Sequence, residues 1–540
     1  MLRRVVHSLF QPWVVALLFL LGFTAWTRLA HLGSVPTSLN WDEAALGYVG
    51  KMVVTTGRDE YNQFLPRVFQ SFGDYKAPLA FYFTGISTTL FGLHAWSVRL
   101  PFALTGIASI GAMVWVAYRV LNNRWIALAA GWLLAVLPWH LLFSRVGFES
   151  GVSLLFLITL WGSWLELRRI QKPHPVWWGV GVLSAIVSVY TYHAARLVVP
   201  LTLILIAAYE LVTNRDWVQK NIRQIGFSIV ACVVLGLPLL FTLRNHGAER
   251  AAQTSVFAQE NSISQGSIRF VQNTFAHMSL RFLVLGETTT LRHGTGENGV
   301  FLYSHFVLFA FGLAFIAARS LEQYTHKRSH SLWTNLHRFI KAKFASDETH
   351  LVGPWIWGAF FVIGLLPAGL GFEVPHANRA LLAAPAAILI MSFTFKEALR
   401  DLTKIAFALL IGMLILFSLL EFSRFWHSYL TTYRTASASE WLAGYPEAAR
   451  LAWEAKLAGK RVKFTSAYGQ PEIFFAFANN LPFDTYRWQR IPGIEFGHIG
   501  PFDEGNYDLL IAGEKEPLSS HPTRTINRPD GTPAFFVYER

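Results

Sequence analysis

Long apolar stretches recur along this chain, and they constrain its fold more than any other feature of the sequence. Many are about twenty residues long, the length that an α-helix needs to cross a membrane. Hydrophobic residues make up 53% of the 540 and charged residues only 15%, a composition typical of integral membrane proteins. The sequence therefore predicts an α-helical polytopic membrane protein with about eleven transmembrane helices. The predicted spans are 13–33, 97–119, 125–142, 150–167, 176–193, 196–212, 224–243, 300–318, 351–371, 379–396 and 405–422.

Another apolar segment, residues 77–93, is shorter and ends in Phe91-Gly92-Leu93. We interpret it as a helix that lies at or dips into the outer membrane interface and does not cross. The basic connections then fall on one side of the membrane and most loop carboxylates on the other, as the positive-inside rule requires. We therefore expect a multi-pass protein of the cell (inner) membrane, with a cytoplasmic N-terminus and an extracytoplasmic C-terminus. The basic connections are 119–124, 168–172, 215–223, 319–343 and 396–404.

The net charge of +13 follows from this topology and from contact with anionic membrane lipids, and it does not indicate nucleic-acid binding. The segment 319–343 is interpreted as a cytoplasmic basic stretch on the lipid surface. Cys232 is the only cysteine, so no intrachain disulfide can form. No small-residue cleavage site follows the first apolar run, and we expect a retained first helix.

The last part of the chain differs in composition. We divide the sequence into a transmembrane domain, 1–422, with a first outer loop at 34–96, and an extracytoplasmic α/β domain, 423–540. In the second domain, residues 437–458 have the pattern of an amphipathic helix. Strands are predicted at 461–466, 507–512 and 534–538.

Two adjacent carboxylates, Asp42 and Glu43, follow the first span and open a helical pattern. Acidic residues are common in the first turn of a helix, where they cap free N–H groups. A carboxylate at a reacting face can instead serve as a general base. The sequence leaves both roles open.

Lys76 precedes Ala77-Pro78, so its backbone should be extended and a helix should begin just after it. A lysine beside a helix N-terminus combines a mobile charge with free backbone N–H groups, which suits a phosphate. A lysine that extends to the membrane interface is the ordinary alternative.

Three short outer turns carry arginines at a membrane boundary: Arg145, Arg196 and Arg379. They are exceptions to the positive-inside bias, and together they suggest a shared anion such as the phosphate or pyrophosphate of a lipid carrier. For each residue alone, an interfacial anchor remains the alternative. The same turns hold further candidate substrate contacts, Glu149, His193 and His376, although a lone histidine is more often structural.

The polar stretch 244–299 is rich in Gly and Thr near its end. This composition is typical of a mobile outer loop that could cover a substrate, and equally of a plain surface loop.

The chain resembles the GT-C fold glycosyltransferases that use polyprenyl-phosphate sugars. Within them it is similar to the bacterial branch related to protein O-mannosyltransferases and to the lipid A aminoarabinose transferase. The resemblance covers about the first 400 residues. It depends on Trp41-Asp42-Glu43-Ala44, Tyr75-Lys76-Ala77-Pro78-Leu79, Arg145 near Glu149, and Pro375-His376-Ala377-Asn378-Arg379.

The resemblance implies that Asp42 is the catalytic carboxylate and that Glu43 supports it or helps to bind a divalent metal ion. Lys76, next to the candidate contact Tyr75, would bind the carrier phosphate. A second acidic motif of some relatives is not clear here, and Glu149 is the nearest substitute. The implied reaction moves a sugar, with inversion, from a polyprenyl-phosphate donor to a lipid, glycan or protein acceptor.

Other classes of protein share some of these features. A lipid-carrier flippase or another polytopic transporter should have broken helices with charges near mid-membrane and two similar halves. An O-antigen ligase or polymerase should carry a large outer loop rich in paired arginine and histidine. A non-catalytic membrane scaffold would not explain Asp42 and Lys76 together. The charges of this chain lie at the outer ends of the spans, which favours the glycosyltransferase.

Overall fold

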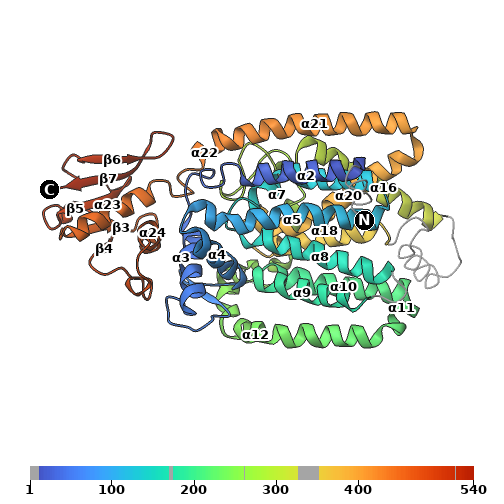
Figure 1. Ribbon diagram of the computed structural model, residues 1–540, viewed down its shortest axis with the longest axis horizontal. Helices are drawn as coiled ribbons and strands as arrows, with labels where there is room; N and C mark the ends of the chain where they lie inside the picture. Colours follow the sequence, from blue (N-terminus) through green and yellow to red (C-terminus); the bar gives the residue numbers. More distant parts are fainter. Residues whose placement is uncertain (1–10, 170–173, 261, 326–351, 517) are drawn as a thin grey trace, which may run out of the picture.

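The computed structural model describes residues 11–169, 174–260, 262–325, 352–516 and 518–540. Long helices run side by side in a bundle, and a small sheet domain lies beyond one end of it (Figure 1). Among the described residues, seven helices are long and apolar enough to cross a membrane by length and composition. The predicted architecture, a helical membrane protein with a small C-terminal α/β domain, is confirmed.

Every predicted span overlaps helical residues. The helices are α2 (Pro12–Leu29), α5 (Ala95–Leu121), α6 (Arg124–Val136), α7 (Pro138–Phe143), α8 (Glu149–Arg169), α9 (Pro175–Thr191), α10 (Ala195–Thr213), α12 (Ile222–Thr254), α16 (Tyr303–Thr325), α18 (Trp355–Gly369), α19 (Ala377–Ala380), α20 (Ala384–Asp401) and α21 (Lys404–Leu430). Most of the predicted basic connection 319–343 lies outside the described residues.

The structure corrects several boundaries. The predicted span 125–142 is two helices, because Leu137 takes an extended conformation before Pro138 and the helix restarts there. Helix α12 continues to Thr254, into the stretch predicted as loop. Helix α21 continues to Leu430, so the domain boundary predicted at 422 falls inside a helix.

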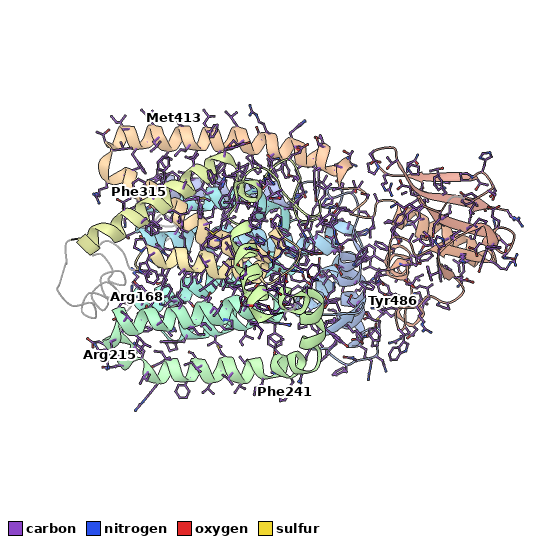
Figure 2. All side chains as sticks on the ribbon, turned by 180° about the vertical axis from the view of Figure 1, so that it is seen from behind. Arg168, Arg215, Phe241, Phe315, Met413 and Tyr486 are labelled. Carbon is purple, nitrogen blue, oxygen red and sulfur yellow. The ribbon has the colours of Figure 1, made fainter. Side chains whose placement is uncertain are left out.

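Outer helices of the bundle present apolar side chains on their free faces. Met413 on α21 and Phe241 on α12 point outward and are 62% and 64% exposed (Figure 2). By contrast, α8 and α20 are mostly buried inside the bundle. Exposed apolar faces of this length are expected where a helix contacts lipid.

Two short helices, α3 (Trp41–Thr56) and α4 (Leu79–Phe91), lie across the end of the bundle that faces the sheet domain (Figure 1). Helix α4 is the segment predicted to lie at the interface. The two helices approach closely at Gly50 and Gly85, where a Cβ on Gly85 would lie 2.2 Å from the carbonyl oxygen of Gly50. A hairpin of β1 (Phe69–Ser71) and β2 (Asp74–Lys76) connects them.

Between α12 and α16 the chain forms three short helices, α13 (Val256–Gln259), α14 (Ile263–Ala276) and α15 (Leu280–Leu283). Residues 284–302 then form an irregular segment before α16. The stretch predicted as one polar loop is therefore largely helical up to residue 283.

The C-terminal domain contains a five-stranded sheet with the order β4-β3-β5-β7-β6. Strands β3, β4 and β5 are parallel to one another, whereas β7 is antiparallel to β5 and β6. The predicted helix 437–458 begins only at Tyr445, because Gly444 (φ +97°) interrupts it. The elements are α22 (Thr432–Ala436), α23 (Tyr445–Leu457), β3 (Val462–Thr465), α24 (Pro471–Ala478), β4 (Glu495–Gly497), β5 (Leu509–Gly513), β6 (Arg524–Asn527) and β7 (Pro533–Glu539).

The sheet domain packs directly on α3. Phe477 of α24 lies against Gly47, where a Cβ would meet its ring at 2.8 Å. The Tyr48 hydroxyl donates to the carbonyl of Leu481 at 2.9 Å. Helix α3 is therefore held between the bundle and the C-terminal domain, and its first turn is fixed from both sides.

Candidate active site

The first turn of α3 is capped by Asn40. Its side-chain oxygen accepts a hydrogen bond from the Glu43 N–H at 2.8 Å, with Asn40 in the extended conformation of an N-cap. Asp42 is therefore not the residue whose side chain caps α3. The N-cap of α3 is Asn40, and Asp42 lies in the acidic first turn that follows it.

Asp42 instead forms an ion pair with Lys76, whose Nζ donates to Asp42 Oδ1. The β1–β2 hairpin positions the lysine, because Lys76 pairs with Phe69 and Phe69 is buried in a stack on Phe81 of α4. The Asp42 side chain is 27% exposed and that of Lys76 is 15% exposed. Both groups are thus rigidly placed and still reachable by a ligand.

Two further carboxylates act on Lys76. Burial opposes its charge, but the fields of Asp42, Glu149 and Asp74 outweigh burial and raise the pKa of Lys76. Glu149 is the first residue of α8, so the bundle itself contributes to this group. The predicted residues Asp42, Lys76 and Glu149 therefore come together, and the lysine stays protonated at neutral pH.

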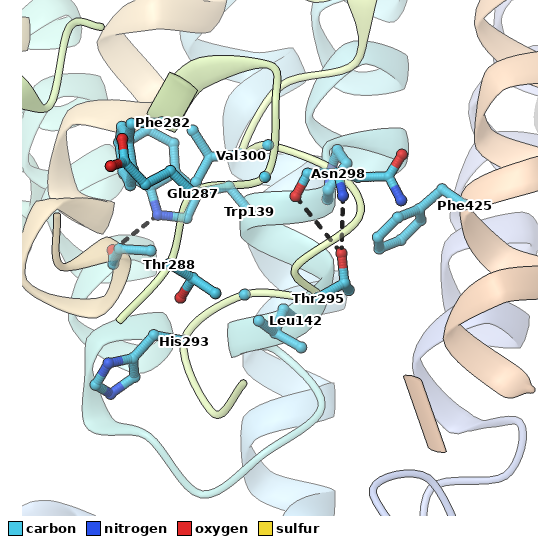
Figure 3. Close-up of a pocket in the computed structure, with 15 residues that line it drawn as sticks. Trp139, Leu142, Phe282, Glu287, Thr288, His293, Thr295, Asn298, Val300 and Phe425 are labelled. Carbon is cyan, nitrogen blue, oxygen red and sulfur yellow. Dashed lines mark hydrogen bonds between the residues drawn. The ribbon is translucent and has the colours of Figure 1, made fainter. Parts of the chain in front are cut away.

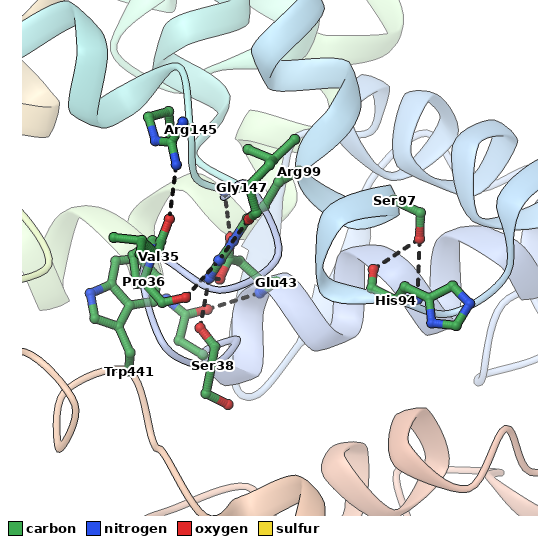
Figure 4. A network of polar contacts seen from close by, with 12 residues as sticks. Val35, Pro36, Ser38, Glu43, His94, Ser97, Arg99, Arg145, Gly147 and Trp441 are labelled. Atoms are coloured by element: carbon green, nitrogen blue, oxygen red, sulfur yellow. Dashed lines mark hydrogen bonds and ion pairs between the residues drawn. The ribbon is translucent and has the colours of Figure 1, made fainter. Parts of the chain in front are cut away.

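Glu43 has a different environment from Asp42. It is 1% exposed, and it accepts hydrogen bonds from Arg99 Nε and Nη2, both at 2.9 Å (Figure 4). Its Oε1 also accepts the Gly147 N–H at 2.8 Å. A Cβ on Gly147 would lie 2.8 Å from Glu43 Cγ, so only glycine fits there. The expectation of a catalytic or metal-binding Glu43 does not fit this placement, because both oxygens already bind protein donors.

Arg99 was not among the residues expected at the site. Besides Glu43, it donates to the carbonyls of Leu32, Pro36 and Ser38 at 2.6–3.2 Å (Figure 4). It also lies 5.6 Å from the Trp441 ring. Arg99 thus fixes the chain that leads from α2 to Asp42. Its signal in the sequence was a charged residue at the start of an apolar span, which needs a partner in a membrane.

Arg145 is also a structural residue. It is fully buried, and its Nη1 donates to the carbonyls of Thr27 and Arg28 at 2.6 and 3.1 Å. Its guanidinium lies about 5 Å from the rings of Trp426 and Tyr429 on α21. The prediction that Arg145 faces a carrier phosphate does not fit this geometry, because the donors point at backbone carbonyls.

A second group forms around His376 and Arg379. His376 Nδ1 accepts the Arg379 N–H at 3.3 Å, so His376 caps the short helix α19. The rings of His376 and His293 are 4.2 Å apart. Burial, with a contribution from Arg292 and Arg379, lowers the pKa of His293 to about 3. The pKa of His376 is also lowered, first by burial and then by His293 and Arg379. Both imidazoles are therefore neutral at neutral pH.

The segment 286–299 connects the two groups. The guanidinium of Arg292 lies 5.6 Å from the ring of Trp41. Trp41 is the residue directly before Asp42 in the chain. Glu440 fixes this part of the segment by accepting hydrogen bonds from the Thr290 hydroxyl and, at 3.3 Å, from the Arg292 N–H. Arg292 is a candidate site residue that the sequence did not point to. Its signal was a basic residue in a Gly- and Thr-rich outer stretch.

The base of the segment packs closely on the bundle. The cavity between them has a volume of about 20 Å³, room for a single water molecule. Its wall includes His293, Thr295 and Trp139 (Figure 3). Asn298 N donates to Thr295 Oγ1 at 3.2 Å within the segment. In this structure the segment is packed against the protein and is not a detached surface loop.

The other predicted residues lie around these groups. Tyr75 is in β2 opposite Gln70, and its N–H donates to Asp74. His193 lies in the turn between α9 and α10, and Arg196 Nε donates to the carbonyl of Val189 at 3.4 Å. Within the described part of the chain, no group of three or more His, Cys, Asp or Glu side chains could hold a metal ion.

Sequence comparisons agree with the fold. The family model of dolichyl-phosphate-mannose-protein mannosyltransferases matches residues 75–241, which begin at the β2 strand. "Putative mannosyltransferase YkcB" of Bacillus subtilis (strain 168) is 23% identical over 212 residues, and "Putative mannosyltransferase YycA" of the same strain is 25% identical over 193. These alignments cover 37% and 35% of this chain, and 28% and 26% of the relatives' lengths.

Solved structures match nearly the whole chain. ArnT from Cupriavidus metallidurans superposes with a TM-score of 0.54 at 12% identity, covering 97% of each chain. Archaeal oligosaccharyltransferase AglB from Archaeoglobus fulgidus gives 0.52 at 11% identity, covering 93% of this chain and 69% of AglB. The protein therefore has the GT-C fold of membrane glycosyltransferases. Within that class, its sequence is similar to proteins named as mannosyltransferases.

Proposed function

We propose that this protein is a membrane glycosyltransferase that moves a sugar from a polyprenyl-phosphate carrier to an acceptor hydroxyl. The reaction takes place at the end of the bundle that carries the C-terminal domain, on the extracytoplasmic side. The observation that carries the proposal is the partly exposed Asp42–Lys76 pair, on a helix turn that Asn40 already caps. The charge pattern of the loops supports the sidedness.

Asp42 is the catalytic carboxylate in this proposal. Free of a capping role, it accepts the proton of the acceptor hydroxyl as the hydroxyl oxygen attacks the anomeric carbon. The bond from that carbon to the phosphate oxygen breaks, and the polyprenyl phosphate leaves with the electron pair. A single displacement of this kind inverts the anomeric centre.

Lys76 and Arg292 stabilise the departing phosphate. Lys76 stays charged because three carboxylates surround it, and Arg292 is held beside Trp41 by the 286–299 segment. Preorganised cations at the developing charge lower the barrier of such a step. When the donor phosphate binds Lys76, it competes with Asp42 for the ammonium group and releases the carboxylate to act as a base.

Arg196 and Arg379 remain candidates for donor contact, with His193, His376, Tyr75 and Glu149 near the substrate. The Arg379 side chain is 22% exposed and lies 3.9 Å from Glu373, at the edge of the His293–His376 group. His293 and His376, both neutral, suit hydrogen bonds to sugar hydroxyls better than contacts to phosphate.

The lipid carrier is inferred from the structural relatives. ArnT has been crystallised bound to undecaprenyl phosphate, and this structure superposes with a TM-score of 0.51 at 12% identity, covering 96% of this chain and 97% of that one. The AglB structure contains an inhibitory peptide and a dolichol-phosphate. The donor here is of the same chemical class, and the acceptor is a lipid, a glycan or a protein.

The transporter or flippase alternative has weaker support. The charged residues of the candidate site lie at one end of the bundle and are positioned by crossing helices α3 and α4 (Figure 1). A carrier that moves its substrate across the membrane needs its binding site near mid-membrane.

The test is direct. The purified full-length protein in detergent is incubated with a panel of polyprenyl-phosphate sugars, and the release of polyprenyl phosphate is followed with and without membrane extract as a source of acceptor. We expect release with at least one sugar and loss of release in Asp42→Asn. If no donor of the panel is consumed while the protein moves intact carrier between leaflets of vesicles, the transporter alternative replaces this proposal.

A further inference from the structure

The half of the bundle away from Asp42 contains a large cavity that glycosyl transfer does not use. It lies between α8, α9, α10, α12 and the short helix α11 (Arg215–Lys220), and its volume is about 470 Å³. Pockets that bind lipid- or drug-sized molecules have volumes in this range. The lining residues of α8, Leu160 to Leu167, lie roughly 16–27 Å along the helix from Glu149, at 1.5 Å per residue. The cavity is thus separate from the candidate active site.

The cavity is closed on the inside and open on one side. Its inner wall contains Ala185 and Trp164, which are 4% and 5% exposed, and Glu210, which forms an ion pair with Arg168 at 2.9 Å. Its outer wall contains residues that are more than half exposed on two helices: Ile204 and Leu211 of α10, and Ile229 and Val233 of α12. The mouth therefore opens sideways between α10 and α12, toward the surrounding lipid, and its apolar walls fit hydrocarbon.

Basic residues lie at the end of this mouth. Trp217 of α11 lines the cavity and stacks on Trp178 with 5.9 Å between ring centroids. Tryptophans are enriched at membrane interfaces. Arg215, Lys220 and Arg223 are exposed within one or two turns of Trp217. Within the described part of the chain, none of these three cations forms an ion pair. Figure 2 shows Arg168 and Arg215 at the same end of the bundle, opposite Tyr486 of the C-terminal domain.

We propose that this cavity is a binding site for an anionic phospholipid from the leaflet opposite the active site. Its acyl chain enters between α10 and α12, and its phosphate lies against Arg215, Lys220 and Arg223. The apolar walls select a hydrocarbon chain, and the three cations select a negative headgroup over a zwitterionic one. The tail of the polyprenyl donor is the competing occupant, but its phosphate belongs at Lys76, at the other end of α8.

The experiment uses the purified, delipidated full chain in detergent. It is titrated with dioleoyl phosphatidylglycerol or with dioleoyl phosphatidylcholine, and bound lipid is counted by native mass spectrometry while Tm is recorded in parallel. We expect one phosphatidylglycerol to bind at least about tenfold more tightly than phosphatidylcholine and to raise Tm. Ala185→Trp and Val182→Phe, which fill the cavity, should abolish this adduct. Leu183→Trp, on the same helix but 60% exposed and outside the cavity, should keep it.

The charges are tested separately, on side chains whose change does not disturb packing. A triple variant should reduce the affinity for phosphatidylglycerol roughly 10- to 100-fold, to the level of phosphatidylcholine. It combines Arg215→Gln, Lys220→Gln and Arg223→Gln. Equal affinity for the two lipids in the unaltered protein, or full binding in the triple variant, would overturn the proposal. A third outcome would also overturn it: undecaprenyl phosphate displaces phosphatidylglycerol, and the cavity-filling variants no longer bind undecaprenyl phosphate. The carrier tail would then be the occupant of the cavity.

Discussion

Two neighbouring carboxylates of the same helix turn have opposite environments. Successive residues of an α-helix point about 100° apart, so Glu43 faces the bundle and Asp42 faces Lys76. Glu43 is held by Arg99 and Gly147, and it anchors the turn that presents Asp42. The structure therefore separates a partly exposed carboxylate, Asp42, from a buried one, Glu43, which the sequence alone did not do.

Asp42→Asn should lower turnover by about 10² or more, the scale of a lost general base, while the protein still folds. The measurement is release of polyprenyl phosphate by purified protein, with a thermal unfolding curve on the same sample. Near-normal turnover in the folded variant would show that Asp42 is not the base.

Lys76→Ala should raise the donor KM about tenfold or more, because the donor phosphate loses a charge-assisted contact of about 1.5–3 kcal/mol. Lys515→Ala, an exposed lysine of the C-terminal domain, is the control and should leave KM unchanged. Indistinguishable donor titrations for the two variants would contradict the phosphate role of Lys76.

Glu43→Gln should act on stability. It leaves the buried Arg99 without its counter-charge, and breaking such a pair costs about 3–5 kcal/mol. The double variant with Arg99→Met should lose less than the sum of the single changes, which a double-mutant cycle measures by thermal or denaturant unfolding in detergent. Additive losses would mean that the two side chains do not act as a pair.

At the scale of elements, the irregular segment 286–299 brings Arg292 to Trp41. Glu440, on the turn between α22 and α23, accepts hydrogen bonds from both the Thr290 hydroxyl and the Arg292 N–H. The segment, the C-terminal domain and α3 therefore position the cations as one assembly.

Glu440→Ala should release this segment and raise the donor KM several-fold, with kcat less affected because Asp42 is untouched. Glu454→Ala, an exposed carboxylate on α23, is the matched control. Donor titrations of both variants check this, and Arg292→Ala combined with Glu440→Ala should add little to Arg292→Ala alone. A fully additive double variant would contradict the positioning role.

At the scale of the whole molecule, the junction between the C-terminal domain and α3 contains a buried carboxyl. Glu60 is 3% exposed, its carbonyl accepts the Trp488 N–H at 3.1 Å, and its Oε1 accepts from Gln489 at 3.4 Å. Burial raises the pKa of Glu60 to about 8, and the nearby Asp59 adds to the rise. The junction thus favours the protonated carboxyl.

This shift makes the stability of the protein depend on pH. Below about pH 4.5 the Glu60 carboxyl is protonated in both the folded and the unfolded chain. Between about pH 4.5 and pH 8 it ionises only in the unfolded chain, so the free energy of unfolding falls as pH rises. Glu60→Gln should remove this loss, which is on the order of 5 kcal/mol at most. Unfolding curves at pH 5 and pH 8 measure it: Tm should rise on substitution mainly at pH 8. An equal change at both pH values would contradict the shift.

The sequence by itself determined the membrane class, the helices that overlap the predicted spans, a separate short helix within 77–93 and the C-terminal α/β region. These features are local: hydropathy over twenty residues and helix-breaking residues act within one element. It also selected Asp42 and Lys76, which form an ion pair in the structure, because each lies at the end of a predicted element. It missed β4 and β6, which are short, and the helices within 244–283.

Only the tertiary structure decided which charged residues face the site. Arg145 and Glu43 bind inside the protein, whereas Arg292, some 250 residues beyond Asp42 in the chain, comes to lie over Trp41. A charge at the end of an apolar span must find a partner, and the partner can be a carbonyl, a carboxylate or a ligand. Which of the three it meets depends on contacts between distant elements, and these are fixed only when the helices pack.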